Sequence, residues 1–290
     1  MDHQIIRAAL IGAALLILPI AASGQESHYF ITYDHHMEEP DNLEISANGV
    51  AGLPKGGGNF LGSWMEFEYG AKGWWTTELY LDGQATSGDS AIFTGWRWEN
   101  RFRPLMREHV INPVFYAEFE DINGADKALK EVVGFDSGRD VPANSILRAD
   151  HQREIETKLI LSSDVRGWNI SENFIAEKNL AAGEPWEFGY SVGISRPLAL
   201  AASPKECTVC IENIRAGLEL YGGLGDTDHT TLSGTSHYLG ALVGWTLPTG
   251  VTFTVEPTWG LTHNSYRGLI RFGVSYEIAG VGRRLRSLFH

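Results

Sequence analysis

From residue 59 onward the chain alternates between apolar and polar positions with a period of two. In the first such segment Leu61, Met65 and Phe67 fall on one face, and Glu66 and Glu68 fall on the other. Successive side chains of a β-strand point to opposite faces, so this pattern predicts strands with one apolar and one polar face. Segments of this kind recur up to residue 278.

The number and length of these segments indicate the fold class. About eleven lie between residues 59 and 278, and one more is expected within residues 28–53, where either 28–34 or 42–50 fits. Residues 168–176 alternate less cleanly because Glu172 interrupts their apolar face. Many segments reach about ten residues, whereas strands of soluble proteins are usually about five or six and membrane-spanning strands need about 9–11. We therefore predict an all-β fold, a closed antiparallel transmembrane β-barrel of about 12 strands, an even number as in bacterial single-chain barrels.

The connections and the aromatic residues give independent support. Short connections alternate with longer or more polar ones, as in barrels with short periplasmic turns and long extracellular loops. The short ones are 71–73, 104–110, 162–167 and 247–250; the longer ones are 122–149 and 225–236, and the long connection 196–211 is an exception on the short side. Aromatic side chains gather near both sets, as expected at two membrane–water interfaces. They are Tyr69, Trp74, Trp75, Phe102, Trp168 and Trp245 at one rim and Phe60, Trp186, Trp259 and Tyr266 at the other.

Within the longest connection, four apolar residues have the spacing of a helix face. These are Ala125, Leu129, Val132 and Val133. A short helix that folds over the outer mouth and a flexible loop both fit this spacing, and the sequence leaves the two open.

The ends of the chain differ from the rest. Arg7 precedes an apolar run from residue 8 to residue 22, which ends in small residues up to Gly24, and this is the pattern of a cleaved secretory signal peptide. An uncleaved anchor is the alternative, although a membrane span needs about 20 apolar residues. We expect a signal peptide at 1–24, the barrel at 25–278 and a basic tail at 279–290, with the last strand ending at Ile278.

Composition and charge exclude other classes. Hydrophobic residues make up 43% of the chain, and this fraction is too low for a bundle of transmembrane helices. The net charge of −13 argues against nucleic acid as a partner. The 33 glycines and 11% aromatic residues suit twisted strands, turns and bends.

If the apolar faces meet lipid, the charged positions of the strands point into an enclosed lumen. An excess of carboxylates there favours cations or cationic solutes. The same charges can instead pair and plug the barrel, or face bulk water in a soluble protein, and about twelve strands give an intermediate diameter. The predicted pore-lining residues are Glu66, Glu68, Glu78, Asp82, Arg97, Glu99, Arg101, Glu118, Glu120, Glu154, Glu156, Lys158, Arg215, Glu256, Arg271 and Glu277.

Three motifs could carry chemistry. Cys207 and Cys210 form a CxxC motif with no second Cys/His pair nearby, so we expect a local disulfide rather than a redox or zinc site. His35 and His36 stand among carboxylates, but neighbours on a strand face opposite ways, so no metal site is expected. The pairs formed by His263 with Ser265 and by Ser236 with His237, near the outer rim, are the candidates for a membrane-embedded lipid hydrolase.

The signal peptide, even strand count, alternating connections and aromatic rims resemble the bacterial outer-membrane β-barrel (porin-like) class. This resemblance is architectural, covers nearly the whole mature chain and implies a non-enzymatic pore for small solutes or ions, without a cofactor. It also implies residence in the Gram-negative outer membrane, contact with its lipids, and insertion by the barrel assembly machinery. One departure is the tail, because such barrels often finish on an aromatic residue at the end of the final strand, whereas here Phe289 follows that strand at a distance. A soluble periplasmic β-barrel or sandwich binding protein remains an alternative.

Overall fold

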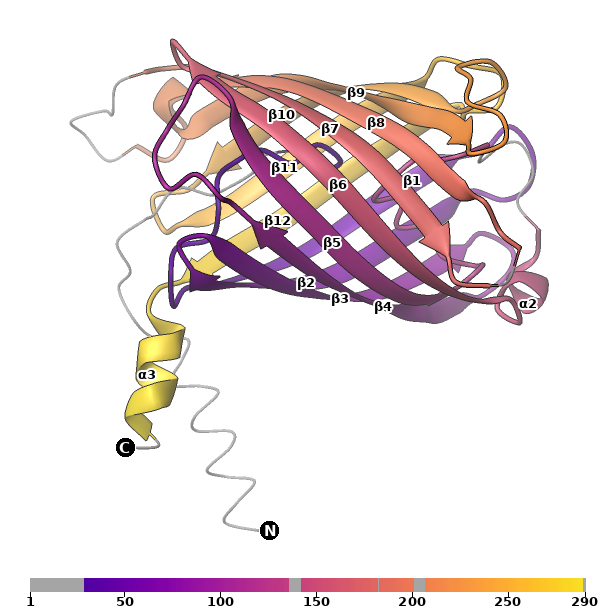
Figure 1. Cartoon of the computed structure of the whole chain (residues 1–290), viewed down its shortest axis with the longest axis horizontal. Coiled ribbons are helices and arrows are strands. Elements are labelled where there is room, and N and C mark those ends of the chain that lie inside the picture. The colour runs from indigo at the N-terminus through magenta and orange to yellow at the C-terminus, as the bar shows by residue number, and fades with distance from the viewer. Residues whose placement is uncertain (1–28, 136–141, 182, 201–206, 289–290) are drawn as a thin grey trace.

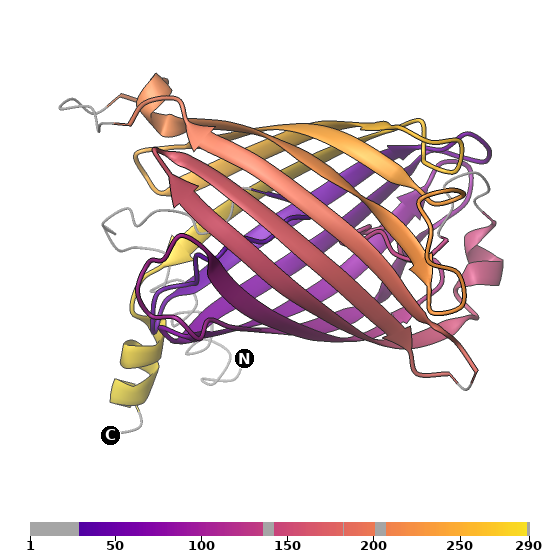
Figure 2. The ribbon, with the colours of Figure 1, turned by 45° about the horizontal axis from the view of Figure 1, so that its top comes forward.

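The computed structural model describes residues 29–135, 142–181, 183–200 and 207–288, and these form one closed antiparallel barrel. Each strand pairs with its neighbours in sequence, and the ring closes where the first strand pairs with the last (Figure 1). The strands run obliquely around the barrel, as the turned view in Figure 2 also shows. In chain order they are β1 (Leu43–Leu53), β2 (Phe60–Lys72), β3 (Trp75–Thr86), β4 (Ala91–Phe102), β5 (Asn112–Asn123), β6 (His151–Val165), β7 (Trp168–Asn179), β8 (Trp186–Pro197), β9 (Ile214–Asp226), β10 (His237–Thr246), β11 (Val251–Gly260) and β12 (Gly268–Ile278).

The predicted fold class is confirmed, with twelve strands in the described residues. Of the two candidates for the first strand, residues 42–50 match β1, whereas residues 29–34 belong to no strand. The less regular segment is a full strand, β7, and β12 ends at Ile278. The predicted signal peptide lies outside the described residues.

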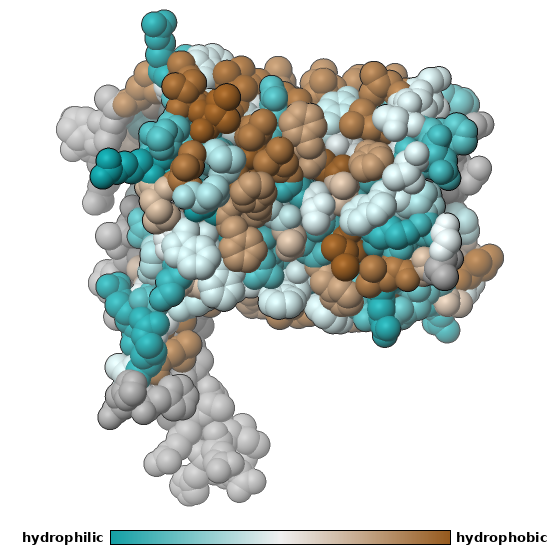
Figure 3. Space-filling model, viewed as in Figure 1, coloured by the Kyte–Doolittle hydropathy of each residue, from teal (hydrophilic) through white to brown (hydrophobic). Residues whose placement is uncertain are grey.

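The alternation along each strand separates two environments. In β6, the apolar side chain of Leu159 is 38% exposed on the outside, while that of the adjacent Lys158 is 2% exposed on the inside. Figure 3 shows brown, hydrophobic side chains over much of the visible outer wall. An apolar exterior around a polar interior is the reverse of a water-soluble sandwich, and it is what a hydrocarbon environment requires. Within the described part of the chain, no helix is both long and apolar enough to cross a membrane.

The seam between β1 and β12 has an unbroken register from Leu43 opposite Ile278 to Leu53 opposite Gly268. In the middle of this seam Gly49 pairs with Phe272, and the phenyl ring covers the glycine so closely that a Cβ there would lie 2.7 Å from Phe272 Cζ. The ring fills the space that the missing side chain leaves.

An even number of strands brings the start of β1 and the end of β12 to the same end of the barrel, which we call the terminal end. The opposite end carries the β5–β6 connection with the short helix α2 (Asn144–Leu147), and we call it the loop end. The difference in connection length is smaller than predicted. The loop end also has the tight β3–β4 connection at 87–90, and the terminal end has the long β8–β9 connection at 198–213.

The terminal end is fastened outside the strand ladder by α3 (Val281–Leu288), so the basic tail is helical up to residue 288. The backbone N–H of Gly282 donates to the carbonyl of Asp41, and the Arg286 guanidinium donates to the Asp41 carboxylate at 2.7 Å. This hydrogen bond holds the pKa of Asp41 below its usual range. The N–H of Gly280 donates to Asn42 Oδ1. We call these contacts the clasp.

Cys207 and Cys210 are joined in a disulfide within the β8–β9 connection, beside the single 3₁₀ turn η1 (Ile211–Asn213) of the described residues. The amide of Asn213 donates to the Cys207 carbonyl, and the indole of Trp245 on β10 donates to the carbonyl of Thr208 at 2.9 Å. The disulfide therefore belongs to a connection that is tied back onto the barrel wall.

The aromatic residues form rims, with one correction. At the terminal end Trp74, Trp75 and Phe102 stack on one another, with ring centroids 6.2–6.4 Å apart. Phe60 and Tyr266, predicted for the opposite rim, are instead buried and pack edge to face at 5.2 Å. Phe60 has the inward parity of β2, which places it inside the barrel rather than at the lipid interface.

Candidate functional site

The lumen is the candidate site, because it gathers the charged positions of the strands. Of the sixteen predicted residues, twelve are buried and four, Glu66, Glu154, Arg215 and Glu277, are partly buried. The buried twelve are Glu68, Glu78, Asp82, Arg97, Glu99, Arg101, Glu118, Glu120, Glu156, Lys158, Glu256 and Arg271. All sixteen lie on the inward face of their strands. The lumen that they face is not empty, because two segments of the chain itself lie inside it.

The first occupant is the N-terminal segment, residues 29–42, which runs inside the terminal half of the barrel. The carboxylate of Glu219 on β9 accepts hydrogen bonds from the backbone N–H groups of Phe30, Ile31 and Thr32, at 2.7–3.2 Å. The Asn173 side chain on β7 bonds both the N–H and the carbonyl of Tyr33. The wall therefore supplies the partners that an extended segment would otherwise find in a neighbouring strand.

The side chains of this segment extend the same contacts. The hydroxyl of Tyr33 donates to Glu99 at 2.9 Å, and its ring lies under the guanidinium of Arg101. Glu38 is 2% exposed and lies near the carboxylates of Glu68 and Glu277.

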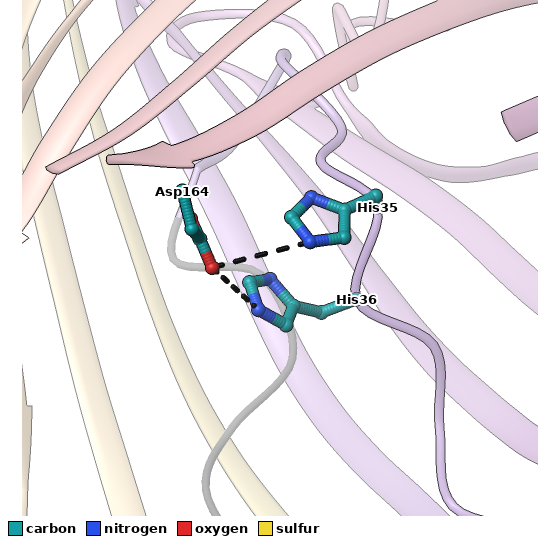
Figure 4. A group of neighbouring side chains, drawn as sticks. All are labelled: His35, His36 and Asp164. Atoms are coloured by element: carbon teal, nitrogen blue, oxygen red, sulfur yellow. Dashed lines mark ion pairs between the residues drawn. The ribbon is translucent and has the colours of Figure 1, made fainter. Parts of the chain in front are cut away.

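Within the N-terminal segment His35 and His36 lie side by side, with ring centroids 4.4 Å apart (Figure 4). Their Nε2 atoms are 3.9 and 3.2 Å from the same oxygen of Asp164, at the end of β6. Burial lowers the pKa of His36, but hydrogen bonds to Asp164 and Asp34 outweigh it and raise the pKa to about 10. The prediction that the two rings point apart is wrong, because this segment is not a strand and the alternation of a strand does not apply to it.

The second occupant is the inserted loop, residues 124–134 of the β5–β6 connection. Arg97 on β4 pairs with Asp126 and Glu131 of the loop, both at 3.0 Å, and with Asp82 on β3 at 2.9 Å. Lys130 of the loop lies over the Tyr80 ring, 3.1 Å from its centroid. The loop therefore contributes charges of both signs to the lumen.

The backbone of the inserted loop is also bound. Arg271 on β12 donates to the carbonyls of Ala128 and Leu129. Val133 makes an isolated bridge to Gly189 on β8, next to a register shift in that strand. Apolar side chains of the two occupants, including Ile31 and Val132, pack with inward aromatic residues of the wall in one cluster.

The helix considered for this region is absent from residues 124–134, and the flexible loop does not describe them either. Ala125, Val132 and Val133 are less than 5% exposed and Leu129 is partly buried, so the predicted spacing reflects burial at three of its four positions. They are buried in an irregular segment enclosed on all sides by the wall. The periodicity of apolar residues indicates that they are buried, but it does not indicate whether a helix face or the lumen of a barrel buries them.

Two cavities remain beside the occupants. One of about 90 Å³ lies against β1, β2 and β12 and is lined by Glu44, Glu66 and Lys130, among others. A larger one of about 560 Å³ lies at the loop end and is lined by Leu129 and Glu131, among others. Residues 129–131 of the inserted loop therefore border both cavities, with Lys130 lining the smaller one and its two neighbours lining the larger one.

The buried charges of the described residues are strongly unbalanced. Twelve buried carboxyl groups face five buried lysine or arginine side chains. The carboxyl groups are those of Asp34, Glu38, Glu68, Glu78, Asp82, Glu99, Glu118, Glu120, Glu156, Glu177, Glu219 and Glu256; the basic side chains are those of Arg97, Arg101, Lys130, Lys158 and Arg271.

Several important residues were missing from the predicted set. Glu219 lies at an inward position in the alternating pattern of its strand, so the pattern alone could have identified it as a lumen residue. Lys130 and Glu131 gave no such signal, because they lie in a connection whose path the sequence does not specify.

His237 and Ser265, one residue from each predicted Ser–His pair, bond other groups in the described structure. The ring of His237 bonds the hydroxyl of Tyr190 at 3.1 Å and that of Thr235 at 2.8 Å. Ser265 is fully buried, and its hydroxyl donates to the backbone carbonyl of His237 rather than to a ring nitrogen. These contacts fasten the β9–β10 and β11–β12 connections to each other.

Comparison with known proteins gives a fold but no family. No family model and no curated protein matches the sequence. Among solved structures, the chain is similar to an outer membrane channel from Pseudomonas putida F1, with a TM-score of 0.51 and 9% identity over 84% of this chain and 97% of that one. The KdgM porin (TM-score 0.48, 8% identity, 80% and 98% covered) and the NanC porin (0.47, 9%, 81% and 98%) are similar at a lower level.

The chain has the fold of the bacterial outer-membrane β-barrel class. At 9% identity the likeness to the Pseudomonas putida channel concerns the fold alone, and it agrees with the closed ring of strands and the apolar outer wall.

Proposed function

We propose that the protein is a narrow, cation-selective pore of the bacterial outer membrane, closed in the described form by its own two inserted segments. In this proposal the terminal end faces the periplasm, as short-turn ends do in this class. The chain reaches the membrane after removal of residues 1–24 and with the help of the barrel assembly machinery. Small solutes or ions cross it, and no cofactor takes part.

One observation carries the proposal. The lumen holds two cavities, of about 90 and 560 Å³, and consecutive residues of the inserted loop line both of them: Lys130 lines the smaller one, and Leu129 and Glu131 line the larger one. A barrel that served only as a rigid structural element would gain most from a close-packed apolar interior. Here the interior is built instead from charged groups, and the proposal is that movement of the irregular inserted loop, which borders both cavities, opens a path between them.

The preference for cations follows from the unbalanced charge. A pore lined mainly by carboxylates attracts cations and repels anions, most strongly where it is narrow and poor in water. Glu44 and Glu66 border the smaller cavity from adjacent strands, and Lys130 stands opposite them. Movement of the inserted loop would withdraw Lys130 and leave a path with negative walls.

The test is conductance in planar lipid bilayers with a KCl gradient, with folding shown by heat-modifiable migration on a denaturing gel. We expect small stepwise currents and a reversal potential that favours K⁺ over Cl⁻. The variant Glu219→Gln removes the carboxylate that accepts three backbone hydrogen bonds of the N-terminal segment, so we expect a several-fold larger or more frequent current. Glu172→Gln, which neutralises an outward carboxylate on β7, is the matched control and should behave like the parent protein.

Folded protein that passes no current, both as the parent chain and as Glu219→Gln, would rule the pore out. A normal current with anion preference would leave the pore in place and refute the cation selectivity. Glu44→Gln combined with Glu66→Gln should shift the reversal potential toward that of a non-selective pore.

A further inference from the structure

The cluster formed by His35, His36 and Asp164 has features that the pore proposal does not use. Each imidazole has one nitrogen bound away from the cluster centre: Nδ1 of His35 contacts Ser162 Oγ at 2.8 Å, and Nδ1 of His36 contacts Asp34 Oδ1 at 3.0 Å. The opposite nitrogens, the two Nε2 atoms, both face Asp164 Oδ2 (Figure 4). Metal-binding histidines are held in this way, with the outer nitrogen bonded to a carboxylate or hydroxyl and the inner one directed at the ion.

A second carboxylate oxygen lies next to His35. Glu108, in the β4–β5 connection, has its Oε2 atom 2.8 Å from Nε2 of His35, and Arg103 holds its other oxygen at 2.6 Å. Two imidazole nitrogens of the N-terminal segment and a carboxylate oxygen at the end of β6 therefore converge, and Glu108 of the β4–β5 connection joins them through His35.

The spacing of these atoms suits a small ion. Zinc binds nitrogen and oxygen ligands at about 2.0–2.2 Å, so two ligands of a tetrahedral site lie about 3.3–3.6 Å apart. The separations of 2.8, 3.2 and 3.9 Å lie on either side of that range, and ligand atoms of His35, His36 and Asp164 all lie within 4.8 Å of one another. The group of His35, His36 and Asp164 is therefore compact enough to surround one ion, and Glu108 stands next to His35 as a further oxygen.

We propose that His35, His36, Asp164 and Glu108 form a binding site for a divalent transition-metal ion of the Zn²⁺ type. The mixed nitrogen and oxygen donors suit Zn²⁺, Co²⁺ or Ni²⁺, whereas Mg²⁺ and Ca²⁺ prefer oxygen ligands alone. An ion can reach the site from the terminal end, because the side chains of Glu108, Asp164 and His36 are 59%, 44% and 40% exposed. His35, at 0%, forms the closed inner side.

The bound ion would fasten the N-terminal segment to the wall. His35 and His36 belong to that segment, while Asp164 and Glu108 belong to the barrel itself. A metal that bridges them adds a crosslink between the two, near the point where the segment turns back toward the terminal mouth. The bound metal would thus hold the N-terminal segment in place inside the lumen.

The test is isothermal titration of Zn²⁺ into untagged, detergent-folded protein that has been treated with a chelator and then freed of it. We expect one ion per chain in the parent protein, and binding at least tenfold weaker in His36→Ala and in Asp164→Asn. Asp34→Asn should weaken binding about tenfold, because partners of ligating histidines typically contribute 10–100-fold to affinity. Mg²⁺ should give no saturable signal at the same concentrations.

The control is His151→Ala. His151 also pairs with a carboxylate, Asp121 at 2.8 Å, but it has a single imidazole and stands at the loop end of the barrel. This variant should bind Zn²⁺ like the parent protein. Unchanged binding in His36→Ala, or equal loss in His151→Ala, would overturn the proposal. Co²⁺ gives a second measurement, since a tetrahedral site produces intense visible absorption bands that should vanish in Asp164→Asn.

Discussion

The two sides of the barrel wall differ in what they present to the lumen. On β3–β6 the inward positions carry large charged side chains, such as those of Arg97, Glu99 and Lys158. On β8 the inward positions between residues 189 and 195 are Gly189, Ser191, Gly193 and Ser195, and glycine, serine and asparagine recur inward on β7 and β9. The first side binds the occupants of the lumen through charge, and the second makes room for them.

On this second side, atoms of the inserted segments lie directly against glycine backbone of the wall. A Cβ at Gly189 would lie 2.4 Å from the carbonyl oxygen of Val132, and one at Gly223 would lie 2.4 Å from that of Gly134. Likewise, the ring of Tyr29 would lie 2.6 Å from a Cβ at Gly193. Both inserted segments therefore press against positions where a side chain would collide with them. One side of the wall thus makes room for the two inserted segments by lacking side chains, and the other side binds them through charged side chains.

The largest effect should come from Arg97→Ala on the charged side. This change leaves the carboxylates of Asp82, Asp126 and Glu131 buried together without their cation. Removal of one partner from a buried ion pair typically costs about 3–5 kcal/mol. We expect a loss of that size in the free energy of unfolding, measured by urea titration in lipid vesicles with tryptophan fluorescence.

The control for Arg97→Ala is Arg153→Ala, whose 61%-exposed guanidinium pairs with Asp121 at 3.3 Å near the loop end. An exposed pair contributes about 0–1 kcal/mol. Similar losses in the two variants would show that the charged side does not hold the inserted loop by buried ion pairs.

A smaller effect is expected from Gly189→Ala on the opposite side. The added methyl must displace Val132 and with it the inserted loop, and overpacking of this kind costs about 1–3 kcal/mol. We also expect faster proteolysis within residues 124–134, measured on protein reconstituted in vesicles. Gly83→Ala, whose Cβ would approach no atom closer than 3.3 Å, should leave both quantities nearly unchanged. Equal sensitivity of the two variants would contradict the close fit of the loop.

The smallest effect should come from Ser191→Ala. The Ser191 hydroxyl is fully buried and has no hydrogen-bond partner among the described residues, so its removal should leave the free energy of unfolding unchanged or raise it by less than about 1 kcal/mol. Ser171→Ala provides the contrast on the adjacent strand, because its hydroxyl bonds Ser162 at 2.8 Å and Asn169 at 3.0 Å. That variant should lose about 1 kcal/mol. The reverse order would mean that Ser191 has a partner in the native lumen.

The wall could be predicted from the sequence because each strand repeats one local rule. Alternation such as that of Lys158 and Leu159 depends only on neighbouring residues and on the two environments that they face. The same rule identified the inward charges on most strands. It failed at Glu172, whose outward carboxylate made a regular strand look irregular, and at Phe60, whose inward parity was outweighed by its position near a strand end.

The occupants could not be predicted in this way, because their conformation depends on a cavity that exists only after the ring has closed. Ile31 and Val132 are buried, yet neither belongs to a strand or a helix. The pairing of His35 and His36 on one side of the chain likewise results from irregular backbone. Local periodicity carries no information about such segments, and the complementary glycines of β2, β8 and β9 are the hint that the sequence offers.

The glycine and phenyl pair at the seam has a consequence for how the barrel is assembled. β1 and β12 are neighbours in space but are the first and last strands in sequence, so their ladder closes the longest loop of the barrel and carries the largest closure entropy of all its strand pairs. A slip of one residue would turn β12 inside out and set the Phe272 ring against Asn48 or Val50, where no bare backbone receives it. Gly49 thus favours one register for the pairing of β12 with β1, and the clasp between Asp41 and Arg286 adds a contact at the terminal end of the closed barrel.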